Sequence, residues 1–373
     1  MGDDANRPGR SGTASRRGVL GSPSSGLGSL TSVAHLPLRI GVIGIEHLHV
    51  FEMVDGLVNA GAATICHSAA DGPLTTMYEG WRTDSERRSV YGVLGDDSLD
   101  LVVLADVPAE RGHLAADALV AGRHVLTAKP AVTSPDELDA IDDAVRSSGR
   151  RWWVFFSERL CNRAITEAIR LVHAGAIGEL VAVAGAAPHT LAADSRPGWF
   201  FDRNRSGGIL VDLAAHQADQ LLTAAGPGAT EVLAATVANV ATPTHPGFQD
   251  LGRMSLRHTT TDGRVVLSDH HVDWLSPAGL GTWGDVRLTL TGTTGSIEVR
   301  SNIDVAGAPG GEHLIIVDAD SARRVDCSGI AVDWAERLRA DIELGTDSFM
   351  DHDHTVAACR LALAAQAHAE ADR

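Results

Sequence analysis

Residues 99–130, LDLVVLADVPAERGHLAADALVAGRHVLTAKP, carry the pattern that decides the fold class. The run LDLVVLAD (99–106) is apolar, β-branched and of strand length, which is typical of a strand buried on both faces. The next segment begins near Pro108 and ends at Gly122, the usual punctuation of a helix, and RHVLTA (123–128) is a second strand. A strand, a helix and a strand in this order predict a βαβ unit with parallel strands.

The same alternation continues on both sides of this unit. Upstream, LRIGVIGI (38–45) is a buried-type strand, and a helical pattern follows it as far as Gly61. Downstream, SPDELDAIDDAVRSSG (134–149) carries the Ser, Pro and Glu of a helix capping box, and RWWVFF (151–156) is a further strand. These segments predict a doubly wound parallel sheet, which binds ligands at the carboxyl ends of its strands.

The pattern changes after Ser157. A helix over residues 163–174 precedes a strand at 180–187, and a further helix is expected to carry Asp212 and His216. From there to residue 326 the chain is mainly a series of strands joined by turns such as TDGR and TGTTGS. Consecutive strands without intervening helices predict a mostly antiparallel sheet in a second, α+β domain.

These changes divide the chain into four segments. Residues 1–36 are rich in Gly, Ser, Pro and Arg, have no apolar periodicity, and predict a disordered tail. We expect residues 37–157 to form the parallel-sheet domain, 158–348 the second domain, and 349–373 a C-terminal helix that packs back on the first domain. The segment SRRGVL (15–20) resembles a twin-arginine export signal, but the polar residues after it favour a flexible extension or a mis-set start.

Composition narrows the class of protein. A formal net charge of −17 argues against a nucleic-acid partner or an anionic membrane surface, and no apolar run is long enough to span a bilayer. Four widely spaced cysteines form no CxxC pair, which favours the cytoplasm and argues against a thiolate metal site. Neighbouring His270 and His271 would point to opposite faces of a strand, so we expect no metal.

The turn after the first strand, GIEHLH (44–49), matches a dinucleotide-binding fingerprint only in part. Gly44 holds the first position of G-x-G-x-x-G, but Glu46 and His49 replace the second and third glycines. The second strand ends without the acid that usually binds the ribose hydroxyls, so NAD and NADP cannot be separated. The motif alone leaves two hypotheses, a dinucleotide site or a domain that has lost its cofactor.

Three side chains form a candidate proton-transfer set. Lys129 directly follows a buried-type strand, and Pro130 biases it to an extended geometry that aims it outward at the sheet edge. Asp212 and His216 lie four positions apart, on one face of the expected helix, among apolar neighbours that indicate burial. The alternatives are a solvated loop lysine and a surface Asp–His contact. A lysine lowers and an aspartate raises the pKa of a nearby imidazole, so the set can hold His216 near neutrality.

Four segments, in this order, resemble the Gfo/Idh/MocA oxidoreductases. They are ALVAGRHVLTAKP (118–130), GAIGELVAV (175–183), SGGILVDLAAHQAD (206–219) and LTGTTGSIEV (290–299). Ala128 departs from the acid that the family usually places before its lysine. The family's threonine-proline motif after the third strand is also absent.

The resemblance implies an N-terminal Rossmann domain, a C-terminal domain with a large open sheet, and NAD or NADP between them. It implies homodimers or homotetramers through the open face of that sheet. Catalysis would fall to Lys129, Asp212 and His216. The cofactor contacts would be Gly44, Ile45, Glu46, His47, His67, Ser68, Asp106, Arg111 and Lys129.

The implied reaction transfers hydride between the nicotinamide and a secondary alcohol or ketone of a sugar, cyclitol or related polyol. His216 would take the hydroxyl proton, Lys129 would stabilise the developing alkoxide, and Asp212 would orient the set. Further substrate contacts, besides Asp212 and His216, are expected from Arg159, His189 and Trp199, although Trp199 is equally compatible with a core position.

Two other functions fit the same residues. One is a lyase or glycosidase that oxidises its sugar transiently with tightly held NAD. The other is a non-catalytic sugar-binding or partner protein that has lost its cofactor.

Overall fold

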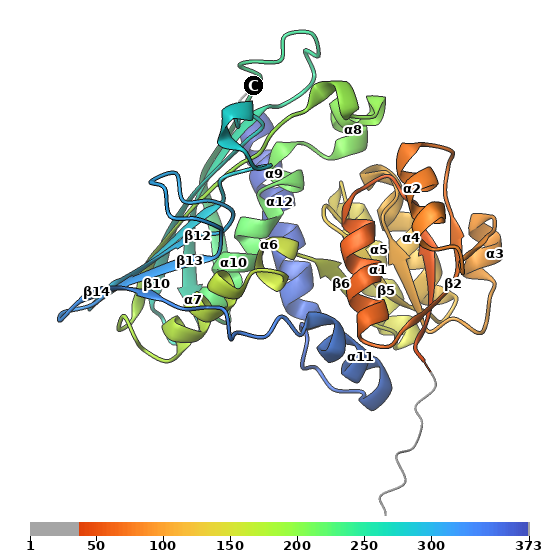
Figure 1. The fold of residues 1–373 in the computed structure, drawn as a ribbon, viewed down its shortest axis with the longest axis horizontal. Coiled ribbons are helices and arrows are strands. Elements are labelled where there is room, and N and C mark those ends of the chain that lie inside the picture. Colours follow the sequence, from red (N-terminus) through yellow and green to blue (C-terminus); the bar gives the residue numbers. More distant parts are fainter. Residues whose placement is uncertain (1–36, 372–373) are drawn as a thin grey trace, which may run out of the picture. The chain divides into compact units, whose positions relative to one another are not determined.

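Two β-sheets organise residues 37–371, the part of the chain that the computed structural model describes (Figure 1). The predicted disordered tail at residues 1–36 lies outside this part, as do residues 372 and 373. The predicted pairing of a parallel sheet with a second, mostly antiparallel sheet is confirmed. No helix within residues 37–371 combines the length and the apolar character needed to cross a bilayer.

The first sheet has six strands, all parallel, in the order β3-β2-β1-β4-β5-β6. The order reverses between β1 and β4, and such switch points are where doubly wound sheets bind ligands. The strands are β1 (Arg39–Ile43), β2 (Ala63–Ser68), β3 (Glu86–Arg87), β4 (Leu101–Leu104), β5 (His124–Ala128) and β6 (Trp152–Phe155). The helices between them are α1 (His49–Asn59), α2 (Pro73–Trp81), α3 (Val90–Leu94), α4 (Pro108–Val120) and α5 (Pro135–Ser148).

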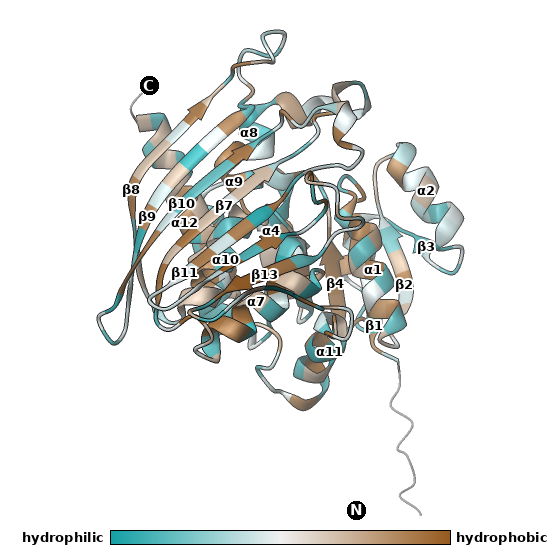
Figure 2. Ribbon diagram, turned by 60° about the vertical axis from the view of Figure 1, so that its left-hand side comes forward, coloured by the Kyte–Doolittle hydropathy of each residue, from teal (hydrophilic) through white to brown (hydrophobic). Residues whose placement is uncertain are grey.

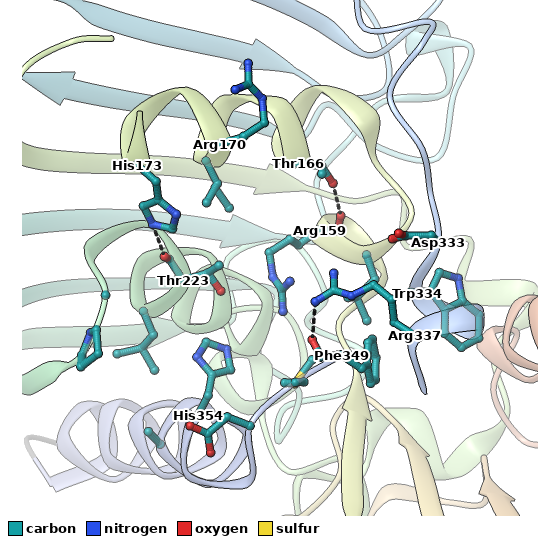
Figure 3. Close-up of a pocket in the computed structure, with 18 of the residues that line it drawn as sticks. Arg159, Thr166, Arg170, His173, Thr223, Asp333, Trp334, Arg337, Phe349 and His354 are labelled. Carbon is teal, nitrogen blue, oxygen red and sulfur yellow. Dashed lines mark hydrogen bonds between the residues drawn. The ribbon is translucent and has the colours of Figure 1, made fainter. Parts of the chain in front are cut away.

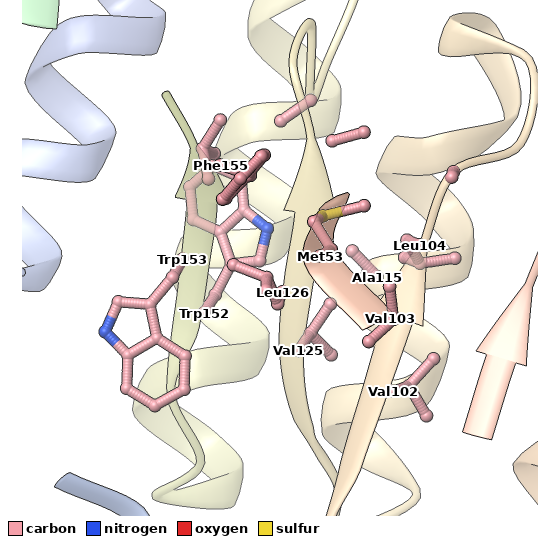
Figure 4. Close-up of a cluster of buried hydrophobic side chains, with 14 of the residues drawn as sticks. Met53, Val102, Val103, Leu104, Ala115, Val125, Leu126, Trp152, Trp153 and Phe155 are labelled. Carbon is pink, nitrogen blue, oxygen red and sulfur yellow. The ribbon is translucent and has the colours of Figure 1, made fainter. Parts of the chain in front are cut away.

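The strands of the first sheet are uninterrupted apolar runs because they lie in the hydrophobic core of the first half of the molecule, the part built around this sheet. Every residue of β4, β5 and β6 is buried, because helices cover both faces of the sheet. Figure 4 shows the side chains of these strands packed with those of α1 and α4. The two large indoles also satisfy their polar atoms, since Trp152 Nε1 donates to Thr127 Oγ1 at 3.0 Å and Trp153 Nε1 donates to the Met350 carbonyl at 3.1 Å.

The second sheet has eight strands in the order β14-β13-β12-β11-β7-β10-β9-β8. The central pair β7–β10 is parallel, and the other pairs are antiparallel. The strands are β7 (Leu180–Pro188), β8 (Gly228–Ala238), β9 (Leu251–Thr260), β10 (Val265–Asp273), β11 (Arg287–Gly292), β12 (Ser296–Arg300), β13 (His313–Val317) and β14 (Ala322–Val325).

Helices cover only one face of the second sheet. Along β9, buried Met254 and Leu256 alternate with exposed Arg253 and Arg257, as expected for a sheet packed on one side. Figure 2 shows the strands side by side, with hydrophilic and hydrophobic residues interspersed along them. The helices of this half are α6 (Ser157–Leu160), α7 (Arg163–His173), α8 (Arg203–Ser206), α9 (Ile209–Asp212), α10 (Ala215–Ala225) and α12 (His352–Ala371). Helix α11 (Trp334–Leu344) packs on α1 and belongs to the core of the first half. Short 3₁₀ turns are η1 (Ala193–Ser195), η2 (Gly198–Phe201) and η3 (Ala278–Leu280).

The last helix joins the two halves. Helix α12 packs on α9, α10 and β8 of the second half and also on α5 and β6 of the first. Gln366 of α12 accepts a hydrogen bond from the Leu210 N–H at 3.0 Å, which fixes the start of α9. The sequence analysis did not predict α2, β3, α3 and α11, which lie where the apolar periodicity is weak.

Candidate active site

A cavity of about 400 Å³ lies where the carboxyl ends of the first sheet meet the helices of the second half. Two residues of the predicted proton-transfer set, Lys129 and His216, line it, together with the predicted contacts His47 and His189. Other lining residues were not predicted as site residues, among them His49, Glu158, Arg196, Trp274 and Trp283.

Lys129 directly follows β5 and is buried, with 4% of its surface exposed. Its Nζ donates to Asp212 Oδ1 at 2.9 Å, so the amine at the edge of the first sheet is bound to the end of helix α9. The solvated loop lysine is therefore not what the structure shows. Lys129 is also the only lysine among the 31 Lys and Arg residues of the chain. An amine and a guanidinium are not interchangeable, and this singularity is a signal that the sequence analysis missed.

Arg111 supports the segment that carries Lys129. It is fully buried, and its Nη1 donates to the carbonyls of Ala128 at 3.0 Å and Pro130 at 2.7 Å, on either side of the lysine. Burial lowers the pKa of Arg111 to about 10. Arg111 does not line the cavity, and its predicted cofactor contact stays a prediction beside this bracing of the backbone.

His216 lies in the first turn of α10 and is 1% exposed. Within residues 37–371 its Nδ1 has no hydrogen-bond partner, and its ring lies 6.3 Å from those of His49 and Phe156. Burial, followed by the charge of Lys129, lowers the pKa of His216 well below its usual value. The imidazole is therefore neutral and able to accept a proton.

The helix expected to carry Asp212 and His216 is interrupted. Helix α9 ends at Asp212 and α10 begins at Ala215, with the His216 N–H turning back to the Leu213 carbonyl at 3.2 Å. The carboxylate of Asp212 consequently accepts a hydrogen bond from Lys129, and in the described part of the chain no hydrogen bond joins it to His216. The break comes from tertiary contacts that the i, i+4 spacing does not encode.

The turn after β1 keeps one glycine for a steric reason. Gly44 has φ of +76°, and a Cβ there would lie 2.2 Å from the Asp106 Cα. Glu46, at the second fingerprint position, accepts a hydrogen bond from Trp199 Nε1 at 3.0 Å, so its carboxylate is held by the second half of the molecule. Ile45 is buried beside it.

This turn fits the phosphate of a dinucleotide. Within residues 37–371, the backbone N–H groups of His47 and Leu48 donate to no protein acceptor, and they lie at the start of α1. Free amides at a helix N-terminus suit an anion. Burial lowers the pKa values of His47 and His49, which keeps both rings neutral beside the cavity. The donors present therefore fit a bound nicotinamide dinucleotide despite the two missing glycines.

The other predicted cofactor residues have protein partners. His67 is buried, with Nδ1 3.0 Å from Ser85 Oγ and Nε2 3.2 Å from Glu79 Oε1, and it does not line the cavity. The Ser68 carbonyl accepts from the Gly44 N–H at 2.8 Å, and Asp106 accepts from the Val107 N–H at 2.7 Å. These bonds shape the turn around Gly44.

Glu158 is a buried acid that the sequence analysis missed. It is the second residue of α6, three positions after the end of β6, is 8% exposed, and lines the cavity. Its Oε2 accepts from Gln217 Nε2 at 3.0 Å and Gln220 Nε2 at 3.1 Å, while Oε1 has no partner within the described residues. Burial raises the pKa of Glu158 to about 7, against the opposing charge of Lys129. Its position after a buried strand, like that of Lys129, was the available signal.

His189 reaches the cavity as predicted. Its Nδ1 is 3.0 Å from the Ala187 carbonyl, which can only accept, so Nδ1 carries the proton and Nε2 is left as an acceptor. Burial lowers the pKa of His189 to about 3. The ring lies 5.3 Å from that of Trp274 and 4.6 Å from that of Trp283. A neutral imidazole between two indoles suits a ring with both polar and apolar edges.

Two predicted substrate contacts are not brought to this cavity. Arg159 makes a two-point ion pair with Asp219, at 2.6 and 2.7 Å, and faces a second cavity of about 730 Å³ (Figure 3). His354 Nε2 lies 2.8 Å from the same carboxylate. Trp199 is buried in the core of the second half and donates to Glu46, so it takes the core position that the sequence analysis held open beside the substrate contact. Polar contacts with residues distant in the sequence hold the side chains of Arg159 and Trp199 outside this cavity.

No group of three or more His, Cys, Asp or Glu residues between residues 37 and 371 is arranged to hold a metal ion.

Comparisons with known proteins identify related chains. Residues 165–298 match the model of the GFO/IDH/MocA C-terminal domain. A solved structure of a candidate oxidoreductase from Erwinia carotovora atroseptica is 30% identical, with a TM-score of 0.85 over 89% of this chain and 98% of that one. A levoglucosan dehydrogenase, solved with NADH and L-sorbose, has a TM-score of 0.70 at 18% identity, over 90% of this chain and 96% of that one, and shows the shared fold.

A curated relative extends the comparison. The scyllo-inositol 2-dehydrogenase (NAD(+)) of Bacillus subtilis is 26% identical over 235 residues, which cover 61% of this chain. The match spans 64% of the length of that relative.

Proposed function

The chain belongs to the Gfo/Idh/MocA family, and on this premise we propose that it is an NAD(P)-dependent dehydrogenase. Its substrate would be a secondary alcohol, or the matching ketone, of a sugar, cyclitol or related polyol. The observation that carries the proposal is the buried amine of Lys129, which is held by Asp212 and lines the same cavity as the neutral imidazole of His216. The named activities of the inositol and levoglucosan dehydrogenases support the substrate class.

The three side chains would divide the work on the reacting hydroxyl. When bound, the nicotinamide supplies the hydride acceptor or donor for the substrate carbon. The Lys129 amine would donate a hydrogen bond to the oxygen and stabilise its developing negative charge. His216 would take the hydroxyl proton at a ring nitrogen, as a neutral buried imidazole can. Asp212 would hold the amine in place and balance its charge in the low-dielectric cavity.

The cofactor would be held at the turn after β1. Gly44, Ile45, Glu46 and His47 form this turn, and the free amides of His47 and Leu48 would receive the phosphates. The substrate would lie against His189 and the neighbouring indoles. We also propose that the open face of the second sheet, which exposes Val265 and Leu267, joins two copies of the chain.

The test begins with the purified protein and both cofactors. We expect NAD+ or NADP+ to raise its melting temperature, and reduced nicotinamide to accumulate when scyllo-inositol or another polyol of a panel is added. Substrate consumption without net reduction of the cofactor would instead indicate a lyase or glycosidase. Absence of any thermal shift with either nucleotide would indicate a non-catalytic binding protein.

A further inference from the structure

Glu158 is a buried carboxyl group with one oxygen in use and one free. Gln217 and Gln220, both on α10, donate to Oε2 and hold the side chain against the cavity wall. Oε1 has no partner among residues 37–371, and the nearest ionisable atom recorded is His189 Nε2 at 4.0 Å. A buried polar atom left without a hydrogen bond costs about 1–3 kcal/mol, so such an atom in a cavity is an indication of use.

No charged group around Glu158 is available to it as a counter-ion. Lys129, which approaches from β5, is bound to Asp212. Arg159, the next residue of α6, is bound to Asp219 of α10, and Asp219 is itself an acid. His189, after β7, and His216, on α10, are both neutral because burial lowers their pKa values. Without a counter-ion, the buried carboxyl group of Glu158 is stable in its protonated form, and it can also exchange a proton with a group in the cavity.

His216 alone cannot complete the proposed reaction. Its imidazole is desolvated and lies near the positive charge of Lys129, so a proton accepted there is held weakly. A second group with a greater affinity for protons must remove it before the next turnover. Glu158 and His216 line the same cavity, and Glu158 Oε1, which has no hydrogen-bond partner among the described residues, lies 4.0 Å from Nε2 of His189 in the wall of that cavity.

We propose that Glu158 is the second proton carrier of this site, taking from His216 the proton that leaves the substrate hydroxyl. The inference rests on the proposed dehydrogenase function. During oxidation the O–H bond breaks, the proton passes through His216 to Glu158 Oε1, and the electron pair of the C–H bond leaves with hydride to the nicotinamide, so a carbonyl forms. Reduction runs the same steps backwards, with Glu158 starting as the protonated acid. The pKa of about 7 suits an acid that must work in both directions.

The experiment compares E158Q with E167Q in both reaction directions. Glu167 is also a buried acid, but it lies on α7, accepts hydrogen bonds from Arg170 and does not line the cavity, so E167Q removes a buried carboxylate outside the site. In the unaltered protein we expect kcat for oxidation to rise with pH through about 7, and kcat for reduction to fall through the same range, since Glu158 must be ionised in one and protonated in the other. E167Q should keep both profiles.

E158Q keeps the shape of the side chain and cannot carry the proton. We expect kcat to fall about 100-fold, KM to change less than about 3-fold, and both pH profiles to become flat near neutrality. E158D retains a carboxyl group and should keep the pH dependence at a reduced rate, which provides the comparison if E158Q does not fold. If E158Q keeps the rate and the profile of the unaltered protein, Glu158 is not a proton carrier, while the dehydrogenase proposal stands. If the unaltered protein turns over no polyol with either nucleotide, the proposed function fails and this inference fails with it.

Discussion

The two cavities of the second half share a wall but differ in how their charges are arranged. Helices α6 and α10 separate them, with Glu158 and His216 facing the smaller cavity and Arg159 facing the larger. In the larger cavity the buried charge is paired, because Asp219 accepts from Arg159 and also contacts His354. In the smaller one, Glu158 Oε1 and His216 Nδ1 have no partner among the described residues.

This difference indicates which cavity does chemistry. The larger cavity, of about 730 Å³, has the greater volume, but its buried ion pair is satisfied and gains nothing from a ligand. Unsatisfied polar atoms cost stability, so they persist where a substrate or a proton completes them. The proposal therefore places the chemistry in the smaller cavity, whose lining includes unpaired polar atoms, although the other cavity has the greater volume.

The largest expected effect concerns Lys129. K129M should lower turnover about 1000-fold, because the developing alkoxide loses its donor. K129R is the matched control, since it keeps the positive charge for Asp212 but not the amine, and it should also be severely impaired. Turnover is followed by nicotinamide absorbance, with circular dichroism to establish folding. Near-normal rates in K129M would remove the smaller cavity from consideration as the catalytic one.

The single lysine allows a second measurement on the same residue. Amine acylation followed by peptide mapping should modify one side chain, and cofactor with substrate should protect it. Unchanged labelling in their presence would contradict the assignment of Lys129 to the bound complex.

Arg159 is expected to matter for stability instead. R159M would leave Asp219, which is wholly buried, with His354 as its remaining partner, and should lower the free energy of unfolding by roughly 3 kcal/mol. Urea denaturation measures this loss. The folded fraction should keep kcat/KM within about 5-fold, because the ion pair lies outside the smaller cavity. A large loss of kcat/KM with unchanged stability would mean that the larger cavity takes part in catalysis.

His216 has a matched control in His270. Both are buried imidazoles with an unpartnered Nδ1 in the described part of the chain, but His270 lies on β10 away from the smaller cavity. H216N should lower kcat about 100-fold, as the immediate proton acceptor is lost, and H270N should leave kcat nearly unchanged. Equal effects of the two substitutions would indicate that any buried histidine matters only for packing.

The smallest expected effect concerns the turn after β1, where Trp199 Nε1 donates a hydrogen bond to the carboxylate of Glu46. W199F removes the donor to the carboxylate and should weaken dinucleotide binding about 3-fold, because an unpaired carboxylate then lies near the phosphates. E46Q should bind at least as tightly as the unaltered protein, and in that background W199F should have less effect. Additive effects in calorimetric titrations of the four proteins would show that the two residues act independently.

The sequence predicted the two-sheet fold and the place of Lys129 because both depend on local patterns. Apolar runs of strand length, helix punctuation and the capping box at Ser134 are properties of neighbouring residues, and the structure forms that capping box. Lys129 follows a buried strand, so its position at the sheet edge is fixed by the strand itself. Site roles for Lys129, Asp212 and His216 remain predictions that the variants above test.

Tertiary structure alone decided which polar groups meet. Glu158 and Arg159 are consecutive, yet a helix turns about 100° between neighbours, so they enter different cavities and find different partners. Lys129 and Asp212 form a hydrogen bond although they lie 83 positions apart in the sequence, and Trp199 and Glu46 do so across 153 positions. The buried guanidinium of Arg111 donates to the backbone beside Lys129. The sequence by itself determined the elements, since hydrophobic period and caps act over a few residues. The pairing and burial of charges depended on the packing of distant elements, because desolvation and partner distance exist only once the chain is folded.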